Sequence, residues 1–273
     1  MSNLCLSDIA AGISYAIDAP TIESELRPYL GMSQLGHDCA RYLWYYFRWA
    51  ATQKHTARTE RIFRRGDLEE ARIISYLNAV GIATIDTQLA MRDVQGHLLG
   101  HADGKVTNIP DLPSETALLE IKTMNEKAFK DITKNKLKMS KPEYFVQLMV
   151  YMHYQQEKYG LFIATNKNTE ELYIEIIDYN EKIATKAIHR AIDIIHTTVP
   201  PSRLSDDPKF YKCGWCAYKA QCHEMAAFKR TCRTCEKVTI GPNGTWLCSK
   251  QENKILSTEE QLATCKEYSV LKV

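Results

Sequence analysis

The sequence lacks any long apolar run and any strong excess of one charge. No stretch approaches the ~20 apolar residues that a membrane-spanning helix needs. No basic segment precedes an apolar one near the N-terminus, where Asp8 interrupts the mildest candidate. We therefore expect a cytoplasmic protein with no membrane partner. The 35 basic and 33 acidic residues leave a net charge of only +2, so a nucleic-acid surface would require local clustering.

Internal repeats and low-complexity segments are also absent from the sequence. Apolar residues make up 45% and charged residues 25% of the 273 positions, as in ordinary globular proteins. A chain of this length can bury one substantial core and carry a small appended module. By contrast, cysteine is abundant, with nine residues. In a reducing compartment this number favours metal or cluster ligation over disulfides.

Apolar periodicity predicts alternating helices and strands. Helices are expected at residues 32–50, 57–80, 142–158 and 179–199, and strands at 82–91, 98–106, 117–123, 160–165 and 171–178. This order predicts an α/β fold with a mixed sheet. Residues 200–208, rich in Pro, Ser and Asp, are typical of a connector. The pattern and the cysteines together predict a first domain over residues 1–230 and a small module over 231–273.

Three charged residues occupy strand positions where charge is costly to bury. Asp103 lies on the second expected strand, and Glu120 and Lys122 lie two apart on the third, so the last two share a face. Phosphodiester hydrolysis needs a divalent cation held by carboxylates and a group that activates water. The alternative is a buried ion-pair network of these carboxylates with Lys122. Spacing, element type and order favour the hydrolytic interpretation.

This arrangement resembles the PD-(D/E)XK nuclease superfamily over roughly residues 60–180. Asp103 corresponds to the family's aspartate and Glu120-Ile121-Lys122 to its E-x-K, although Ala102 replaces the usual preceding proline. The resemblance implies a restriction-endonuclease-like mixed sheet flanked by helices. Upstream, residues 66–70 resemble the G-x-x-x-E element of lambda-type phage exonucleases, with Glu70 where RecB-like relatives often have histidine.

Two residues on a later expected helix extend the resemblance. Gln147 and Tyr151 lie four apart on one helical face and match the Q-x-x-x-Y element of RecB-like nucleases. By this resemblance they orient the phosphodiester, and Lys122 positions or deprotonates the attacking water. The implied ligands of Mg²⁺ or Mn²⁺ are Glu70, Asp103, Glu120 and the carbonyl of Ile121.

One set of four cysteines brackets the expected catalytic region. Cys213, Cys216 and Cys222 resemble the C-terminal triplet of iron–sulfur nucleases of the AddB and CRISPR-associated RecB-like types, and Cys39 resembles their upstream cysteine. Four thiolates favour a [4Fe–4S] cluster, but the same ligands could hold Zn²⁺. Closing so long a loop is worth on the order of 5 kcal/mol in the chain-entropy picture, so a structural clamp is the expected role.

A second set of cysteines lies in the tail, which has too few apolar residues for a core of its own. A C-x2-C pair followed by two later cysteines indicates a small zinc site, and similar tails occur on phage nucleases of the resembling type. The alternative is free surface cysteines. The expected zinc ligands are Cys232, Cys235, Cys248 and Cys265. Cys5 is left without a role.

A local basic cluster provides a candidate DNA surface. Seven lysines between residues 122 and 141 face only two acids, Glu126 and Asp131, although a solvated helix explains this charge equally well. The expected DNA contacts are Lys127, Lys130, Lys134 and Lys141. The aromatic segment 41–49 could stack on bases, but a buried helix is the favoured interpretation.

These patterns predict a metal-dependent DNA exonuclease for recombination, repair or phage DNA processing, in the host cytoplasm if phage-encoded. The alternatives are a catalytically weak DNA-binding scaffold that recognises ends or junctions, and a restriction-type endonuclease. A ring-shaped homo-oligomer or a recombination or replication protein as partner would be compatible with the resemblance, and no residue pattern demands either.

Overall fold

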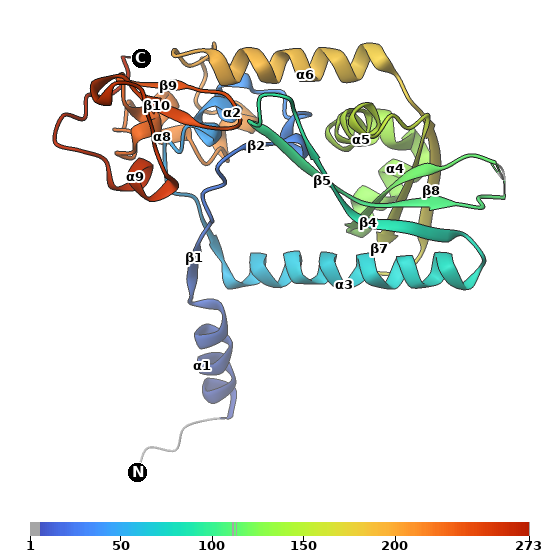
Figure 1. Ribbon diagram of the computed structural model, residues 1–273. Coiled ribbons are helices and arrows are strands. Elements are labelled where there is room, and N and C mark those ends of the chain that lie inside the picture. Colours follow the sequence, from blue (N-terminus) through green and yellow to red (C-terminus); the bar gives the residue numbers. More distant parts are fainter. Residues whose placement is uncertain (1–5, 111, 113, 273) are drawn as a thin grey trace.

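The computed structural model describes residues 6–110, 112 and 114–272, so Cys5 lies outside the described residues. Figure 1 shows how the elements are arranged. The helices are α1 (Leu6–Asp18), α2 (Ala40–Phe47), α3 (Ala57–Ala79), α4 (Glu126–Ser140), α5 (Pro142–Gln155), α6 (Glu181–His196), α7 (Tyr211–Gly214), α8 (Lys219–His223) and α9 (Thr258–Ala263), with 3-10 turns η1 (Met32–Gln34), η2 (Cys232–Thr234) and η3 (Ser249–Gln251). The strands are β1 (Thr21–Glu23), β2 (Leu30–Gly31), β3 (Lys54–Thr56), β4 (Ala83–Arg92), β5 (Leu98–Thr107), β6 (Ala117–Met124), β7 (Tyr159–Asn166), β8 (Leu172–Asp178), β9 (Val238–Ile240), β10 (Trp246–Cys248) and β11 (Lys254–Ile255).

The expected helix over 32–50 is wrong in its first half. Only η1 forms there, and α2 begins at Ala40 because Cys39 has an extended backbone and caps the helix. The Cys39 thiol accepts a hydrogen bond from the backbone N–H of Tyr42 at 3.4 Å. Most of the aromatic residues that follow are buried, as in Trp44 and Phe47, and Tyr42 and Tyr46 are half-buried against the same core, which confirms the core interpretation of this segment.

Six strands of the described chain form one mixed sheet, in the order β2-β5-β6-β7-β8 with β4 paired to β5. β6 and β7 are parallel over their whole length, whereas β4, β5 and β6 pair antiparallel. β4 lines one edge of β5, so β2 and β6 must share the other edge. The predicted α/β class with a mixed sheet is therefore confirmed.

Helices cover both faces of this sheet, with α3 below it and α5 and α6 above it in Figure 1. On the α3 side, Ile73 and Leu77 pack with Leu119 and Ile121 of β6 in one core. On the opposite side, Leu118 packs in the larger core that includes residues of α5 and α6. The alternation of β6 side chains thus places Glu120 and Lys122 toward α5.

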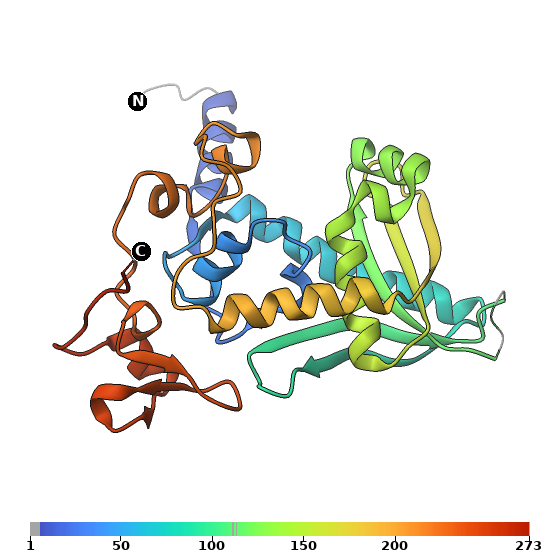
Figure 2. The same ribbon diagram turned by 90° about the horizontal axis from the view of Figure 1, so that it is seen from above.

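The C-terminal segment forms a small three-stranded antiparallel sheet, β9–β10–β11, joined to η2 and α9. Figure 2 shows α6 running from the large sheet toward this segment. One contact between the two parts is made by Arg233, which is fully buried and donates to the carbonyls of Phe47 and Pro28, both at 2.9 Å. A second is the hydrogen bond between His97 and the carbonyl of Gly241 at 2.8 Å. Whether residues 231–273 form a separate module stays a prediction.

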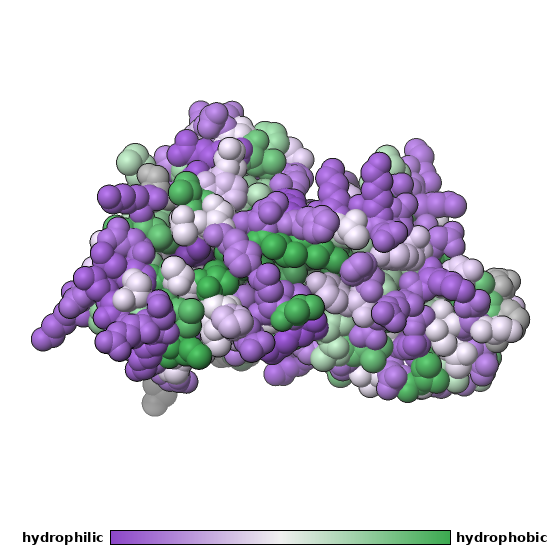
Figure 3. Space-filling model, turned by 45° about the horizontal axis from the view of Figure 1, so that its top comes forward, coloured by the Kyte–Doolittle hydropathy of each residue, from purple (hydrophilic) through white to green (hydrophobic). Residues whose placement is uncertain are grey.

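On the face shown in Figure 3, hydrophilic residues dominate and apolar residues gather in limited patches. No helix among the described residues is long and apolar enough to cross a bilayer.

Candidate active site

Along one edge of β5 the sheet opens between two partner strands, β2 and β6. We call this opening the fork. β2 pairs with Leu98 and Leu99, and β6 pairs with β5 only from Gly104 to Val106. On this edge of β5, residues 100–103 lie between the two partners. Asp103 and Glu120 therefore stand where β5 and β6 diverge, and the opening lets side chains from both helical layers approach them.

Glu120 is fully buried at this fork and is paired with Lys122. The Lys122 ammonium contacts Glu120 Oε1, and the Gln147 amide donates to the same oxygen at 2.6 Å. Burial raises the pKa of Glu120 to about 7, although the charge of Lys122 opposes this. Burial lowers the pKa of Lys122, but the carboxylates of Glu120 and Asp103 outweigh it and raise that pKa. The ammonium therefore keeps its proton.

The second oxygen of Glu120 is different, because Oε2 is buried and has no hydrogen-bond partner among the described residues. A buried carboxylate oxygen without a partner carries a desolvation cost. A cation at this oxygen would remove that cost. The oxygen donors present therefore fit a hard divalent cation.

Asp103 lies across the fork and is bound to the neighbouring strand. Its Oδ2 accepts a hydrogen bond from the backbone N–H of Ile121 at 2.6 Å. Burial raises the pKa of Asp103, while Lys122 and the Ile121 N–H oppose the shift. The Ile121 side chain is buried toward α3.

Glu70 approaches the same fork from α3. Its Oε1 accepts a hydrogen bond from the Gln88 amide at 2.6 Å. Burial raises the pKa of Glu70, the charge of Asp103 adds to the shift, and Gln88 and Lys122 oppose it. Glu70 is thus within electrostatic range of both Asp103 and Lys122, whereas its neighbour Glu69 pairs with Arg72 instead.

Gln88 holds Glu70 from an unusual backbone conformation. The pairs Thr87↔Gly104 and Leu89↔Ala102 place Gln88 opposite Asp103 on β4, and its φ is +51°. A non-glycine residue in this region is strained by roughly 1 kcal/mol or more. The sequence offers no signal for Gln88, because an exposed glutamine in a strand is unremarkable until the pairing and the φ are known.

The first three turns of α5 complete the fork from the other side. Gln147 and Tyr151 are both buried, and burial raises the pKa of the Tyr151 hydroxyl. The Tyr151 ring packs against Gly100, where an added Cβ would lie 2.7 Å from Tyr151 Cε1. Tyr144, three residues before Gln147, places its ring 5.5 Å from Lys122 Nζ. Sequence reasoning missed Tyr144, although its helical spacing from Gln147 indicates the same face.

The structure thus brings Glu70, Asp103, Glu120, Lys122, Gln147 and Tyr151 to one fork. Even so, no three His, Cys, Asp or Glu side chains of the described residues are arranged to hold one metal ion. Each of the three carboxylates accepts from the protein through one oxygen: Glu120 from Lys122 and Gln147, Asp103 from the Ile121 N–H, and Glu70 from Gln88.

The basic cluster lies on α4, directly after β6. Lys127, Lys130 and Lys134 are exposed at helical spacing on one face, and Lys130 pairs with Glu126 at 2.6 Å. Lys141, half-buried, follows the helix, which bends at Lys136 where φ is +61°. The cluster is a solvated helix face adjoining the strand that carries Lys122.

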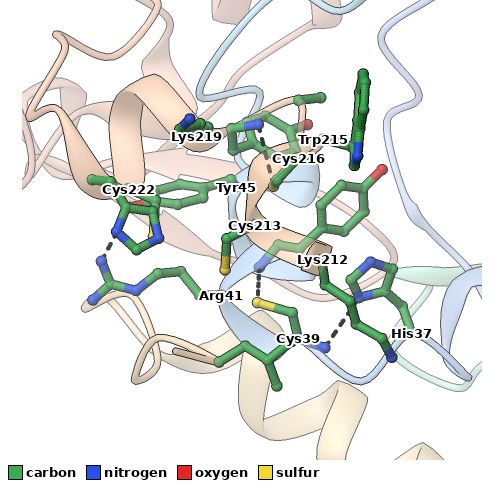
Figure 4. A pocket seen from close by; sticks show the side chains of 15 residues that line it. His37, Cys39, Arg41, Tyr45, Lys212, Cys213, Trp215, Cys216, Lys219 and Cys222 are labelled. Carbon is green, nitrogen blue, oxygen red and sulfur yellow. Dashed lines mark hydrogen bonds between the residues drawn. The ribbon is translucent and has the colours of Figure 1, made fainter. Parts of the chain in front are cut away.

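The first set of thiols lines one cavity, which Figure 4 shows from close by. Its volume is about 240 Å³. Backbone N–H groups point at two of the sulfurs, from Tyr42 to Cys39 and from Tyr218 to Cys216, both at 3.4 Å. Such N–H···S bonds stabilise thiolates and tune clusters. The four thiols that line the cavity are Cys39, Cys213, Cys216 and Cys222.

The second set of thiols also lines a common cavity, but one of only about 10 Å³. Burial raises the pKa of Cys232 to about 11, and the charges of the other three thiols add to this. The four are mutually close although they are not in ligating positions as they stand. The thiols that line this cavity are Cys232, Cys235, Cys248 and Cys265.

Comparisons with known proteins give no family. No protein-family model and no curated protein matches the sequence. Among solved structures, SSO0001 is similar with 16% identity and a TM-score of 0.45, over 75% of this chain and 90% of that chain. The alkaline exonuclease LHK-Exo from Laribacter hongkongensis is similar with 18% identity and a TM-score of 0.45, over 61% of this chain and 86% of that chain.

A phage-related exonuclease from Haemophilus somnus is similar with 15% identity and a TM-score of 0.35, over 49% of this chain and 68% of that chain. Likenesses at this level do not by themselves assign a function to the chain.

Proposed function

We propose that the chain is a deoxyribonuclease of the PD-(D/E)XK type that depends on a divalent metal ion. The observation that carries this proposal is the fully buried Glu120 at the strand fork, with one oxygen on Lys122 and the other without a partner. A structural ion pair does not need an unpartnered second oxygen, whereas a metal ligand does. The residues that would hold Mg²⁺ or Mn²⁺ are Glu70, Asp103, Glu120 and the carbonyl of Ile121.

The roles of the other residues follow from their surroundings. When bound, the cation supplies Lewis-acid stabilisation of the phosphoryl oxygens. Lys122 keeps its proton, so its role is to hold the attacking water and to donate to the charge that develops on the phosphate. Gln147 fixes the Glu120 carboxylate, and Tyr151 and Gln147 line the position of the phosphodiester. Removal of the water's proton then falls to bulk solvent or to a carboxylate.

The finer proposal is an exonuclease that digests linear DNA in recombination, repair or phage DNA processing. It is supported by the G-x-x-x-E element, whose Glu70 points to the fork, and by the Q-x-x-x-Y element, whose Gln147 contacts Glu120. The phosphate backbone of the substrate would be held beside the fork by Lys127, Lys130, Lys134 and Lys141.

Digestion of end-labelled linear and covalently closed circular DNA with Mg²⁺ or Mn²⁺ tests both the deoxyribonuclease proposal and the finer exonuclease proposal. The wild-type protein should degrade the linear form, and Glu120→Gln and Lys122→Met should lose activity by about 100-fold or more. Glu181→Gln, an exposed acid on α6, is the matched control and should retain activity. Undiminished hydrolysis by pure Glu120→Gln protein would overturn the site.

Two other outcomes assign the alternatives. Cutting of closed circles at discrete positions would indicate a restriction-type endonuclease. Tight DNA binding without turnover in any divalent metal would indicate a scaffold.

For the thiols we propose a [4Fe–4S] cluster at the first set and one zinc ion at the second. Because Zn–S bonds are about 2.3 Å, four thiolates around one zinc enclose almost no free space. The second set lines a cavity of about 10 Å³, and the first set lines a wider pocket together with aromatic and basic residues. Anaerobically purified protein should contain about four irons and one zinc per chain. Zinc alone at both sets would contradict the proposal.

A further inference from the structure

Trp215 is the most exposed large aromatic side chain of the molecule and lies between two thiols of the first set. Its side chain is 94% exposed, in the sequence Cys213-Gly214-Trp215-Cys216. The other tryptophans of the chain, Trp44, Trp49 and Trp246, are at most 1% exposed. In Figure 4 the Trp215 ring stands at the rim of the pocket, away from the sulfur atoms. An exposed indole offers a flat face on which a planar ligand can stack.

The surroundings of Trp215 are aromatic and basic. Tyr211 is 68% exposed four residues earlier. The stretch from 208 to 223 contains Lys209, Lys212 and Lys219 and is flanked by Asp207 and Glu224. Lys212 pairs with Asp38, and Lys209 is exposed. Aromatic rings interleaved with cations suit a ligand that has both flat apolar faces and anionic groups.

This surface adjoins the end of α5 that faces the fork. The Glu143 carboxylate, on the first turn of α5, is near enough to act on the charge of Lys212. The next residue, Tyr144, lies against the Lys122 ammonium. In addition, Gly36, in the segment that leads to Cys39, packs so tightly on Glu143 that an added Cβ would lie 2.5 Å from its backbone. The first turn of α5 therefore lies between this surface and the fork.

We propose that Trp215 stacks on an unpaired base of single-stranded DNA, with Lys209 and Lys219 facing the adjacent phosphates. The inference rests on the proposed function for its choice of DNA. The stacking itself does not require catalysis, since it concerns a different part of the surface.

Trp215 fluorescence provides a direct test, because the other three tryptophans are buried. The full-length protein with its native metals is titrated with oligo-dT and with a blunt duplex of equal length, in Ca²⁺ rather than Mg²⁺. We expect oligo-dT to quench the red-edge tryptophan emission, and the duplex to quench it far less. Trp215→Ala should bind oligo-dT about 10-fold more weakly or worse, and Trp215→Phe should recover most of the affinity.

Tyr76→Ala is the matched control, because Tyr76 is an exposed aromatic (52%) on α3, far along the chain from the thiols. Its oligo-dT affinity should equal that of the wild-type protein. An unchanged visible spectrum in Trp215→Ala shows that the thiol site is intact. The inference is overturned if oligo-dT leaves the red-edge emission unchanged, if Trp215→Ala binds as tightly as wild type, or if anionic vesicles quench and oligo-dT does not. Loss of DNA cleavage in the wild type with quenching intact would instead count against the proposed function alone.

Discussion

Glu120 is a destabilising residue in the metal-free protein at neutral pH. Burial raises its pKa to about 7 from an ordinary value of 4.5, so between these values the folded protein binds more protons than the unfolded chain. Stability therefore falls as pH rises through this window, by up to about 3 kcal/mol. Glu120→Gln removes this titration. Urea unfolding from about pH 5 to about pH 8 should show a decline in the wild type that is steeper than in the variant.

The effect of Mg²⁺ on thermal stability provides a second test of Glu120. Mg²⁺ competes with protons for the carboxylates, so Mg²⁺ should raise the Tm of the wild type more at about pH 8 than at about pH 6. Glu120→Gln should show little Mg²⁺ effect at either pH. An equal Tm shift in wild type and variant would mean that the ion binds elsewhere.

Gln88 links β4 to the site through its hydrogen bond to Glu70. Gln88→Ala removes the hydrogen bond to Glu70, so we expect Mn²⁺ affinity, measured by calorimetry, to fall by about 10-fold to 100-fold. Gln88→Gly removes the same bond but also the strain of φ +51°, so it should share the metal defect while being about 1 kcal/mol more stable than Gln88→Ala. The adjacent Thr87→Ala is the control. Unaltered Mn²⁺ affinity in both Gln88 variants would leave Gln88 without a role at the site.

The sequence predicts those site residues whose positions follow from helix and strand periodicity. The two-residue spacing of Glu120 and Lys122 predicts one face, and the four-residue spacing of Gln147 and Tyr151 predicts another, and both spacings hold in the structure. The role of Gln88 could not be predicted, because it depends on strand register and on a positive φ. Neither of these can be read from a single sequence. The catalytic roles of the site residues stay predictions.

At the scale of elements, the segment between η1 and α2 positions α5. Gly36 lies against the first turn of α5, and an added Cβ would meet the Glu143 backbone at 2.5 Å. Backbone cannot yield as a flexible side chain can, so Gly36→Ala should cost about 1–3 kcal/mol and shift the helix that carries Gln147. Urea unfolding and the cleavage assay should both report the loss.

Gly66 on α3 is the matched control for this substitution. No atom lies within 4 Å of an added Cβ there, so Gly66→Ala should raise stability by about 0.5–1 kcal/mol through helix propensity. A loss of activity in the stabilised Gly66→Ala protein would show that the substrate occupies the free space beside Gly66 on α3. Equal stability of Gly36→Ala and wild type would contradict the proposed packing.

The elements themselves were largely predictable, and the exception has a local cause. The change from a helical to an alternating pattern after Gly81 marks the end of α3 and the start of β4. The helix expected from residue 32 does not form over its first part, because aromatic density alone does not make a helix and Cys39 caps α2 with an extended backbone. The strand fork depends on where β5 leaves β6, and pairing of this kind is set by tertiary contacts.

At the scale of the whole molecule, two buried arginines join the C-terminal segment to α2. The Arg233 guanidinium lies 3.7 Å from the Trp49 ring centroid, and Arg48 donates to the Arg233 carbonyl at 3.1 Å. Burial lowers the pKa of Arg48 to about 10 and also lowers the pKa of Arg233, and among the described residues no carboxylate charge offsets either shift. The guanidinium groups are held by backbone carbonyls and aromatic faces instead.

This joint predicts that residues 231–273 do not unfold alone. Arg233→Met leaves the carbonyls of Phe47 and Pro28 without a donor, so we expect a loss of about 3 kcal/mol or more and one cooperative transition, with zinc and iron released together. Arg92→Met, an exposed arginine on β4, should change stability by about 0.5 kcal/mol or less. Tryptophan fluorescence and a chromogenic chelator follow unfolding and metal release in the same sample. If zinc leaves at lower urea while iron and the α2 core persist, the segment is an independent module and Arg233 only tethers it.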